Sequence, residues 1–445
     1  MDLFGQRYRF VSAAPVVARG TLAMVILAAA FSPLAVFGET VEEKYENGRI
    51  KIRFETTRDK KNGSYEEFFE SGQPRVVASY KQGELDGEYV RYHENGKIAT
   101  RANYRKGKKH GAYVERSEEG QPLLTVSYSA GKRKGKQTIY RDGKRHWEYA
   151  WKKGELLKIN DTKTQLHTLK DVKKGLAKVY KAKVKLRSAP EEHVAALRRL
   201  NAYRFLCGLP ADITLEARQS YHCQAAAELL KLHGQLDHTP PKPAGMGEKR
   251  YQEGFLGTTR SNLALGTDLA VSIDHYFYDS DNFNIGNIGH RRWCMNPEMR
   301  TTGFGRHENF CVMWSMDNRR RPVPDHLFIA YPPQGYLPLE YFSTHHAWSV
   351  SLNKKYIQSN ETSKATIYPL DENLVPGEPL ELAHHSYVGE AAPNVDMGPE
   401  NVLVFKPESL DLSPGNRYAV EVTGITDNND KEIKLHYVVE FIELD

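Results

Sequence analysis

Glycine recurs at a fixed spacing of 24 residues through the first third of the chain. Three separate glycine registers keep this spacing, and a slip of one residue carries two of them on to Gly143 and Gly154. Chance does not align three registers, so residues 41–157 are predicted to form an internal repeat array. The registers are Gly63, Gly87, Gly111 and Gly135; Gly48, Gly72, Gly96 and Gly120; and Gly83, Gly107 and Gly131.

Each repeat unit is predicted to be one β-hairpin. Dipeptides such as Asn95-Gly96 and Asp142-Gly143 are typical of hairpin turns, because glycine tolerates the positive φ that such turns require. Between the turns, apolar and polar residues alternate, as in residues 76–80 and 88–92. One hairpin cannot bury its own aromatic face, so we expect stacked hairpins to build a continuous core.

The spacing of glycines and tyrosines, with Tyr65, Tyr89 and Tyr113 in step, resembles MORN-type repeats. That resemblance implies an interaction platform for a protein or an anionic envelope polymer. Lysine and arginine are frequent on the strands, which fits a basic docking surface. They fit equally a solvated face that keeps a β-array from aggregating through its edges. The basic residues are Arg101, Arg105, Lys106, Lys108, Lys109, Lys132, Arg133, Lys134 and Lys136.

The first 38 residues have the pattern of a secretory signal peptide. Arg7, Arg9 and Arg19 precede an apolar run over residues 21–37, and small residues follow it. An uncleaved anchor is the alternative. Export predicts a secreted, periplasmic or cell-envelope location, and it makes nucleic acid an unexpected partner. Export also permits disulfides. Cys294 and Cys311 are close enough in sequence to pair, with free buried thiols as the alternative.

Residues 158–188 interrupt the period with a lysine-rich stretch, which we interpret as a basic linker with a short helix in it. The chain beyond Arg187 is acidic by about 11 charges, whereas the array is basic. Such a division indicates two surfaces with different partners.

Helical periodicity returns from residue 189, and short strands follow before residue 331. Short motifs in this region resemble the bacterial, SCP-like branch of the CAP superfamily. They are residues 200–204, Asp237-His238-Thr239, Ser261-Asn262-Leu263, residues 289–293 and Gly303-Phe304-Gly305. The resemblance implies an α-β-α sandwich over residues 189–335, with a ligand cleft that accepts a small apolar or lipid-like molecule.

The resemblance also implies candidate site residues. His238 and His290 match the two cleft histidines of the family, and two imidazoles can hold a divalent cation such as zinc. The carboxylate half of the family's metal site is missing, because Ser261 stands where a glutamate is expected. Glu253 is the candidate replacement. The predicted cleft residues are therefore His238, His290, Asn262, Ser261, Glu253 and Arg291, with no certain cofactor.

Strand patterns with turn residues between them fill residues 345–445 and favour an Ig-like β-sandwich. The predicted fold class is thus α+β and multidomain. No G-x-S-x-G or H-E-x-x-H motif is present in the chain, so a binding protein is favoured over an enzyme. The alternatives are a metal-assisted hydrolase that uses His238 and His290, and a structural envelope protein.

Overall fold

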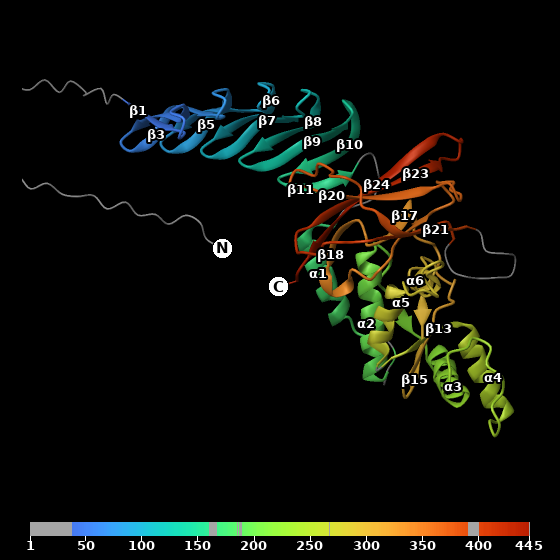
Figure 1. Cartoon of the computed structure of the whole chain (residues 1–445). Helices are drawn as coiled ribbons and strands as arrows, with labels where there is room; N and C mark the ends of the chain where they lie inside the picture. Colours follow the sequence, from blue (N-terminus) through green and yellow to red (C-terminus); the bar gives the residue numbers. More distant parts are fainter. Residues whose placement is uncertain are drawn as a thin grey trace, which may run out of the picture.

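The computed structural model describes residues 38–159, 167–184, 186, 189–266, 268–389 and 400–444. The predicted signal peptide lies outside the described residues apart from Gly38, as do residues 160–166, 185, 187 and 188 of the predicted linker. The chain forms three parts whose spatial order differs from their sequence order (Figure 1). The C-terminal strands, in orange and red, lie between the array, in blue to teal, and the helices α3 and α4.

The array is one eleven-stranded sheet in which every strand pairs with its neighbours in the chain. All of these pairs are antiparallel, as a succession of hairpins requires. The strands are β1 (Glu39–Lys44), β2 (Ile50–Thr57), β3 (Lys60–Phe68), β4 (Pro74–Lys81), β5 (Glu84–Tyr92), β6 (Ile98–Arg105), β7 (Lys108–Arg116), β8 (Pro122–Ser129), β9 (Lys132–Arg141), β10 (Lys144–Lys152) and β11 (Glu155–Ile159).

Two kinds of turn alternate from β1 to β9. The Gly83 register occupies two-residue turns with positive φ at both positions, 53° at Gln82 and 92° at Gly83. The Gly48 register lies in longer loops, such as the one where the His93 N–H donates to the carbonyl of residue 97 at 2.8 Å. The sequence analysis placed Gly143 in this second register. Gly143 does lie between β9 and β10, the place of that register in the strand order, but the loop is shortened there to a two-residue turn of Asp142 and Gly143.

The third register, which begins at Gly63, lies inside strands. Gly87 has a φ of 121°, and the pairing of β4 with β5 shifts between Ala78 and Tyr80, opposite it. A Cβ on Gly87 would lie 3.2 Å from the Cβ of Ser79. These glycines therefore mark β-bulges, which increase the local twist of the sheet.

We expect Gly96→Val to destabilise the array locally by about 1–3 kcal/mol. The φ of Gly96 is 81°, and a Cβ at this position would have no neighbour within 4 Å, so the cost comes from backbone strain alone. Gly96→Asn is the matched control, because asparagine tolerates this conformation far better than valine. Hydrogen exchange of the β5 and β6 amides measures the effect. Equal protection in the two variants would contradict the strained turn.

Residues 191–314 form a small sheet with helices on both faces. The three-stranded sheet has the order β13-β16-β15. Val312 of β16 belongs to the buried cluster that contains Leu230 of α3, whereas the next residue, Met313, belongs to the core that contains Ile273 of α5. The elements are α2 (Glu191–Leu206), β12 (Thr214–Leu215), α3 (Ala217–His233), α4 (Glu248–Thr259), β13 (Ser261–Leu265), α5 (Leu269–Tyr278), α6 (Gly289–Cys294), β14 (Thr301–Thr302), β15 (Phe304–His307) and β16 (Phe310–Trp314). Membership of the CAP superfamily stays a prediction.

Part of the predicted linker is a packed helix, α1 (Leu169–Lys181). Thr168 and Asp171 form a capping box at its N-terminus. Val172, Leu176 and Val179 are buried in the same core as α2. This segment therefore belongs to the folded body rather than to a spacer.

The C-terminal part consists of two four-stranded sheets, β17-β19-β22-β21 and β18-β24-β23-β20. Its first strand, β17, comes from the end of the region that was predicted to be CAP-like and pairs with β19. β18 begins at the last residue of that region, Gly335, and pairs with β24. The Ig-like assignment stays a prediction. The elements are β17 (Phe328–Tyr331), β18 (Gly335–Pro338), the 3₁₀ helix η1 (Leu339–Tyr341), β19 (Trp348–Leu352), β20 (Lys364–Leu370), β21 (Leu382–Val388), β22 (Val402–Pro407), β23 (Arg417–Thr426) and β24 (Glu432–Ile442).

A buried cluster joins the array to β23 and β24. The indole of Trp147 stacks on the imidazole of His436 with 4.0 Å between ring centroids, and its Nε1 donates to Glu421 at 3.2 Å. The hydroxyl of Tyr149 lies 3.3 Å from His436 Nε2. His146 Nε2 lies 3.4 Å from the same Glu421 carboxylate. Two imidazoles and one carboxylate are thus held between the two parts.

This cluster predicts that the protein loses stability as the pH falls below about 6.5. Burial, with a further contribution from the charge of His146, holds the pKa of His436 well below its ordinary value. The folded chain therefore stays neutral at His436 while the unfolded chain takes up a proton. The stability is complete above the unfolded pKa and declines as the pH falls toward the folded pKa. Thermal unfolding across this range measures the slope, which should be shallower in His436→Gln; an unchanged slope would contradict the prediction.

Candidate functional site

The predicted histidines lie on either side of the junction between α4 and β13. His238 is exposed, and its Nδ1 lies 2.8 Å from the carbonyl oxygen of Thr258, near the end of α4. The carbonyl of His290 accepts a 2.9 Å hydrogen bond from the amide of Asn262, on β13. The segment from residue 258 to residue 262 thus contacts both histidines.

His290 is paired with an acid. Its Nδ1 lies 2.8 Å from Oδ1 of Asp279, a carboxylate that is buried and also accepts from the backbone N–H of Arg291 at 3.1 Å. Burial opposes the charged imidazole, but the hydrogen bond and charge of Asp279 outweigh it and raise the pKa of His290. Asp279 is not among the cleft residues that the sequence analysis predicts.

The other predicted cleft residues are bonded within the fold. Ser261 is buried, with its hydroxyl 3.7 Å from Cys223 Sγ. Glu253 accepts from the hydroxyl of Tyr221 at 2.6 Å and lies 3.5 Å from Arg250, so its carboxylate is engaged between α3 and α4. Arg291 is fully buried.

The described residues contain no group of three or more His, Cys, Asp or Glu that could hold a metal ion. All four cysteines are free thiols in the structure, so the disulfide between Cys294 and Cys311 is not formed. Burial raises the pKa of both thiols, which keeps them unreactive. His222 is buried in α3, with its Nδ1 3.2 Å from the carbonyl of Glu253.

A second candidate site lies on the array. Tyrosines of neighbouring strands meet in pairs on one face, Tyr65 with Tyr80 at 5.3 Å and Tyr89 with Tyr104 at 5.7 Å between ring centroids. A third pair repeats the contact at 5.7 Å. We call this surface the aromatic face; it comprises Tyr65, Tyr80, Tyr89, Tyr104, Tyr113, Tyr128 and Trp151.

Cations stand over the aromatic face at the repeat spacing. Lys61 Nζ lies 4.4 Å from the ring centroid of Tyr65, and Lys109 Nζ lies 4.3 Å from that of Tyr113. Arg133 takes the equivalent place over Trp151 at 4.9 Å. Such cation–π contacts hold these positive charges against the rings.

A loop of the C-terminal part covers one end of this face. Arg133 donates to the carbonyl of Glu372 and, at 3.0 Å, to Oδ1 of Asn373. Gln137 donates to the carbonyl of Asn373, whose own amide donates to Glu115 at 3.0 Å. We call residues 371–375, which follow β20, the inserted loop. The inserted loop accepts hydrogen bonds from the guanidinium of Arg133 and the side-chain amide of Gln137.

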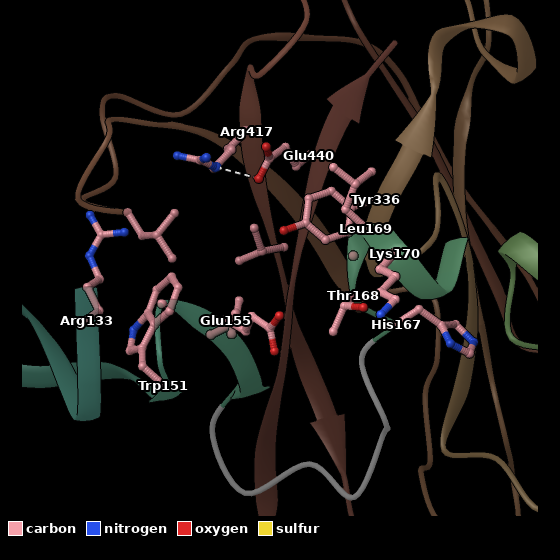
Figure 2. Close-up of a pocket in the computed structure, with 15 residues that line it drawn as sticks. Arg133, Trp151, Glu155, His167, Thr168, Leu169, Lys170, Tyr336, Arg417 and Glu440 are labelled. Carbon is pink, nitrogen blue, oxygen red and sulfur yellow. Dashed lines mark hydrogen bonds and ion pairs between the residues drawn. The ribbon is translucent and has the colours of Figure 1, made fainter. Parts of the chain in front are cut away.

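A cavity of about 230 Å³ adjoins the inserted loop where the array, α1 and the C-terminal sheets meet (Figure 2). Figure 2 shows Trp151 and Arg133 on the array side and Thr168, Leu169 and Lys170 at the start of α1. The cavity wall on the C-terminal side includes Arg417, which is paired with Glu440 at 2.7 Å. All three parts line this cavity, so its shape depends on how they pack.

Sequence reasoning did not identify the inserted loop or its partners. The available signal was Gln137, which stands 24 residues after Tyr113 where the repeat predicts a tyrosine. A polar residue in an aromatic position indicates a local polar contact. Nothing in the sequence identified Asn373 as its partner, because the two residues are 236 positions apart.

The stacked hairpins and the aromatic face define a β-hairpin repeat protein. Residues 61–82 and 85–106 match the MORN repeat variant family, which confirms the predicted repeats in that stretch. The search of curated proteins found no match to the chain. Among the described residues, no helix has the length and apolar character needed to cross a membrane.

Proposed function

We propose that this chain is an exported binding protein that docks a partner through the aromatic face of its hairpin array. The observation that carries the proposal is the inserted loop, a polypeptide segment of the chain itself that occupies one end of the face. MORN repeats suggest the same binding or docking role, and the matched residues cover the first two tyrosine pairs of the face.

Exposure along the face supports free sites beyond the inserted loop. Tyr113 and Tyr128, next to the loop, are 6% and 5% exposed. Tyr89 and Tyr104, one repeat earlier, are only half-buried. The difference fits a surface that one internal segment covers at one end and leaves accessible along the rest.

Photo-crosslinking tests the docking role. A benzophenone amino acid at Tyr89 should form a covalent adduct with a partner in the organism that makes the protein. The matched control carries the same group at Asn103, which is exposed on the opposite face of the neighbouring strand. An adduct at position 89 alone is the expected result. Equal labelling at both positions, or none at either, would rule out docking on the aromatic face.

The helical part supplies a second candidate function, a hydrolase or small-ligand cleft at His290. The hydrogen bond with Asp279 favours it, because an acid behind an imidazole orients the ring for proton transfer. A CAP-like cleft for an apolar or lipid-like molecule is the binding version of this idea. Ester or peptide hydrolysis that disappears in His290→Ala would establish the enzyme; its absence in both proteins would leave the binding role.

A further inference from the structure

From the docking role proposed above, on which this inference rests, we infer that the free site between Arg91 of β5 and Lys109 of β7 binds an acidic turn of a partner protein. The inserted loop is the template, because it occupies the equivalent site one unit further along. Arg133, Gln137 and Glu115 are the array residues that hold it. Subtracting one repeat of 24 residues converts them to Lys109, Tyr113 and Arg91. Tyr113 is already buried beside the inserted loop, whereas Arg91 is exposed and Lys109 is half-buried.

The inserted loop shows what shape of segment the face accepts. Oδ1 of Asp371 accepts from the backbone N–H groups of Asn373 and Val375, each at 2.8 Å, which closes a compact turn. Asn373 at its tip meets the polar residues of the array. Leu374 is buried beside it in the cluster that contains Tyr113 and Tyr128. The occupant is therefore a turn with a polar tip followed by an apolar side chain.

At one position the free site has a hydrogen-bond donor where the occupied site has an acceptor. Glu115 accepts from the amide of Asn373 in the occupied site. Arg91 takes the place of Glu115 one unit earlier. It lies opposite Thr100 on the neighbouring strand, and its guanidinium donates to the hydroxyl of Thr100 at 3.2 Å. An arginine here cannot accept a hydrogen bond, so the tip of the partner must supply only acceptors.

A carboxylate satisfies both cations of the free site. Lys109 replaces Arg133, so the positive charge of the occupied site is kept and that of Arg91 is added. The surrounding strands agree, because residues 98–159 contain 16 Lys and Arg against 6 Asp and Glu. Aspartate or glutamate at the position of Asn373 is thus the complementary tip. The half-buried rings of Tyr89 and Tyr104 lie on the same face of the array.

The preceding site provides an internal contrast. Leu85 stands there in place of Lys109, and Glu67 stands in place of Arg91. Glu67 is already paired with Arg75 at 3.1 Å. The two positions equivalent to Lys109 and Arg91 therefore carry no cation at that site, and the nearby Arg75 is engaged by Glu67. The acidic turn should favour the site at Arg91 and Lys109.

Two cyclic peptides test the inference by fluorescence anisotropy with the whole mature protein. One carries residues 368–378 of this chain, closed through terminal cysteines to hold the turn. The other is identical except for Asn373→Asp. We expect the Asp peptide to bind about ten-fold more tightly than the Asn peptide, because a charge-assisted contact to Arg91 replaces a mismatched amide.

The decisive variant is Arg91→Glu, which recreates the polarity of the occupied site. It should reverse the preference, so that the Asn peptide binds better than the Asp peptide. Glu67→Gln is the control at the preceding site and should change neither affinity. Equal affinities, or a preference that Arg91→Glu leaves unchanged, would overturn the acidic-turn inference, as would the absence of binding. Because the crosslink at position 89 does not depend on these peptides, it shows separately whether docking itself fails.

Discussion

Arg291→Met should lower the free energy of unfolding by about 3–5 kcal/mol, although the substitution preserves much of the side-chain length. Arg291 is fully buried and donates to the carbonyls of Phe277 and Tyr278 at 2.7 and 2.8 Å. It also donates to the carbonyl of Ala347 at 2.8 Å, on the C-terminal side of the interface. Methionine would leave three buried acceptors without donors, and each such loss is costly.

Chemical denaturation of the two variants Arg291→Met and Arg300→Met makes the comparison. Arg300 is exposed and lies in the same stretch of chain, so its replacement should change stability by no more than about 0.5 kcal/mol. A cleft residue would behave differently, since its loss would leave stability intact and reduce ligand uptake. A cost below about 1 kcal/mol for Arg291→Met would show that water replaces the lost donors.

Arg291 also illustrates why the sequence could predict the candidate site only in part. The match to a family motif placed it beside His290, and adjacency along the chain suggested a shared role. The structure directs its guanidinium toward Ala347, 56 residues away. Burial decides between a ligand contact and a structural one, and burial depends on packing partners that periodicity does not reveal.

The array was predictable because its information is local. Glycines at positive φ and alternating strands recur within each unit, so the hairpin pattern follows from one repeat. The packing between parts was not predictable in this way. The inserted loop, the helix α1 in the predicted linker and the buried His436 all depend on contacts between distant segments.

Two glycines of the helical part were identified by a sequence motif, and the structure explains why no side chain fits at either position. Gly303 and Gly305 matched a family motif, with Phe304 between them. The structure turns Phe304 toward the core that contains α2 and α5, and both glycines toward α3. A Cβ on Gly303 would lie 2.2 Å from the backbone nitrogen of Ser220. The absence of side chains on these two residues lets the strand lie directly against the helix.

Gly305→Ala should therefore destabilise the protein by about 3 kcal/mol, a large effect for one methyl group. Its Cβ would stand 2.2 Å from the carbonyl carbon of Cys223 and from the backbone nitrogen of Gln224. Backbone atoms of a helix cannot move aside as a flexible side chain can, so β15 and α3 must separate. Separation would also open the contact between Cys223 Sγ and the carbonyl of Gly303, now 3.4 Å.

Gly286→Ala is the matched control, because a Cβ there would have no neighbour within 4 Å and its φ is not in the left-handed range. It should be neutral, or stabilising by about 0.5 kcal/mol, since alanine reduces the freedom of the unfolded chain. Thermal and denaturant unfolding of both variants give the difference directly. If Gly305→Ala proved as stable as Gly286→Ala, β15 could not lie as close to α3 as the structure places it, and the glycine pair would need another explanation.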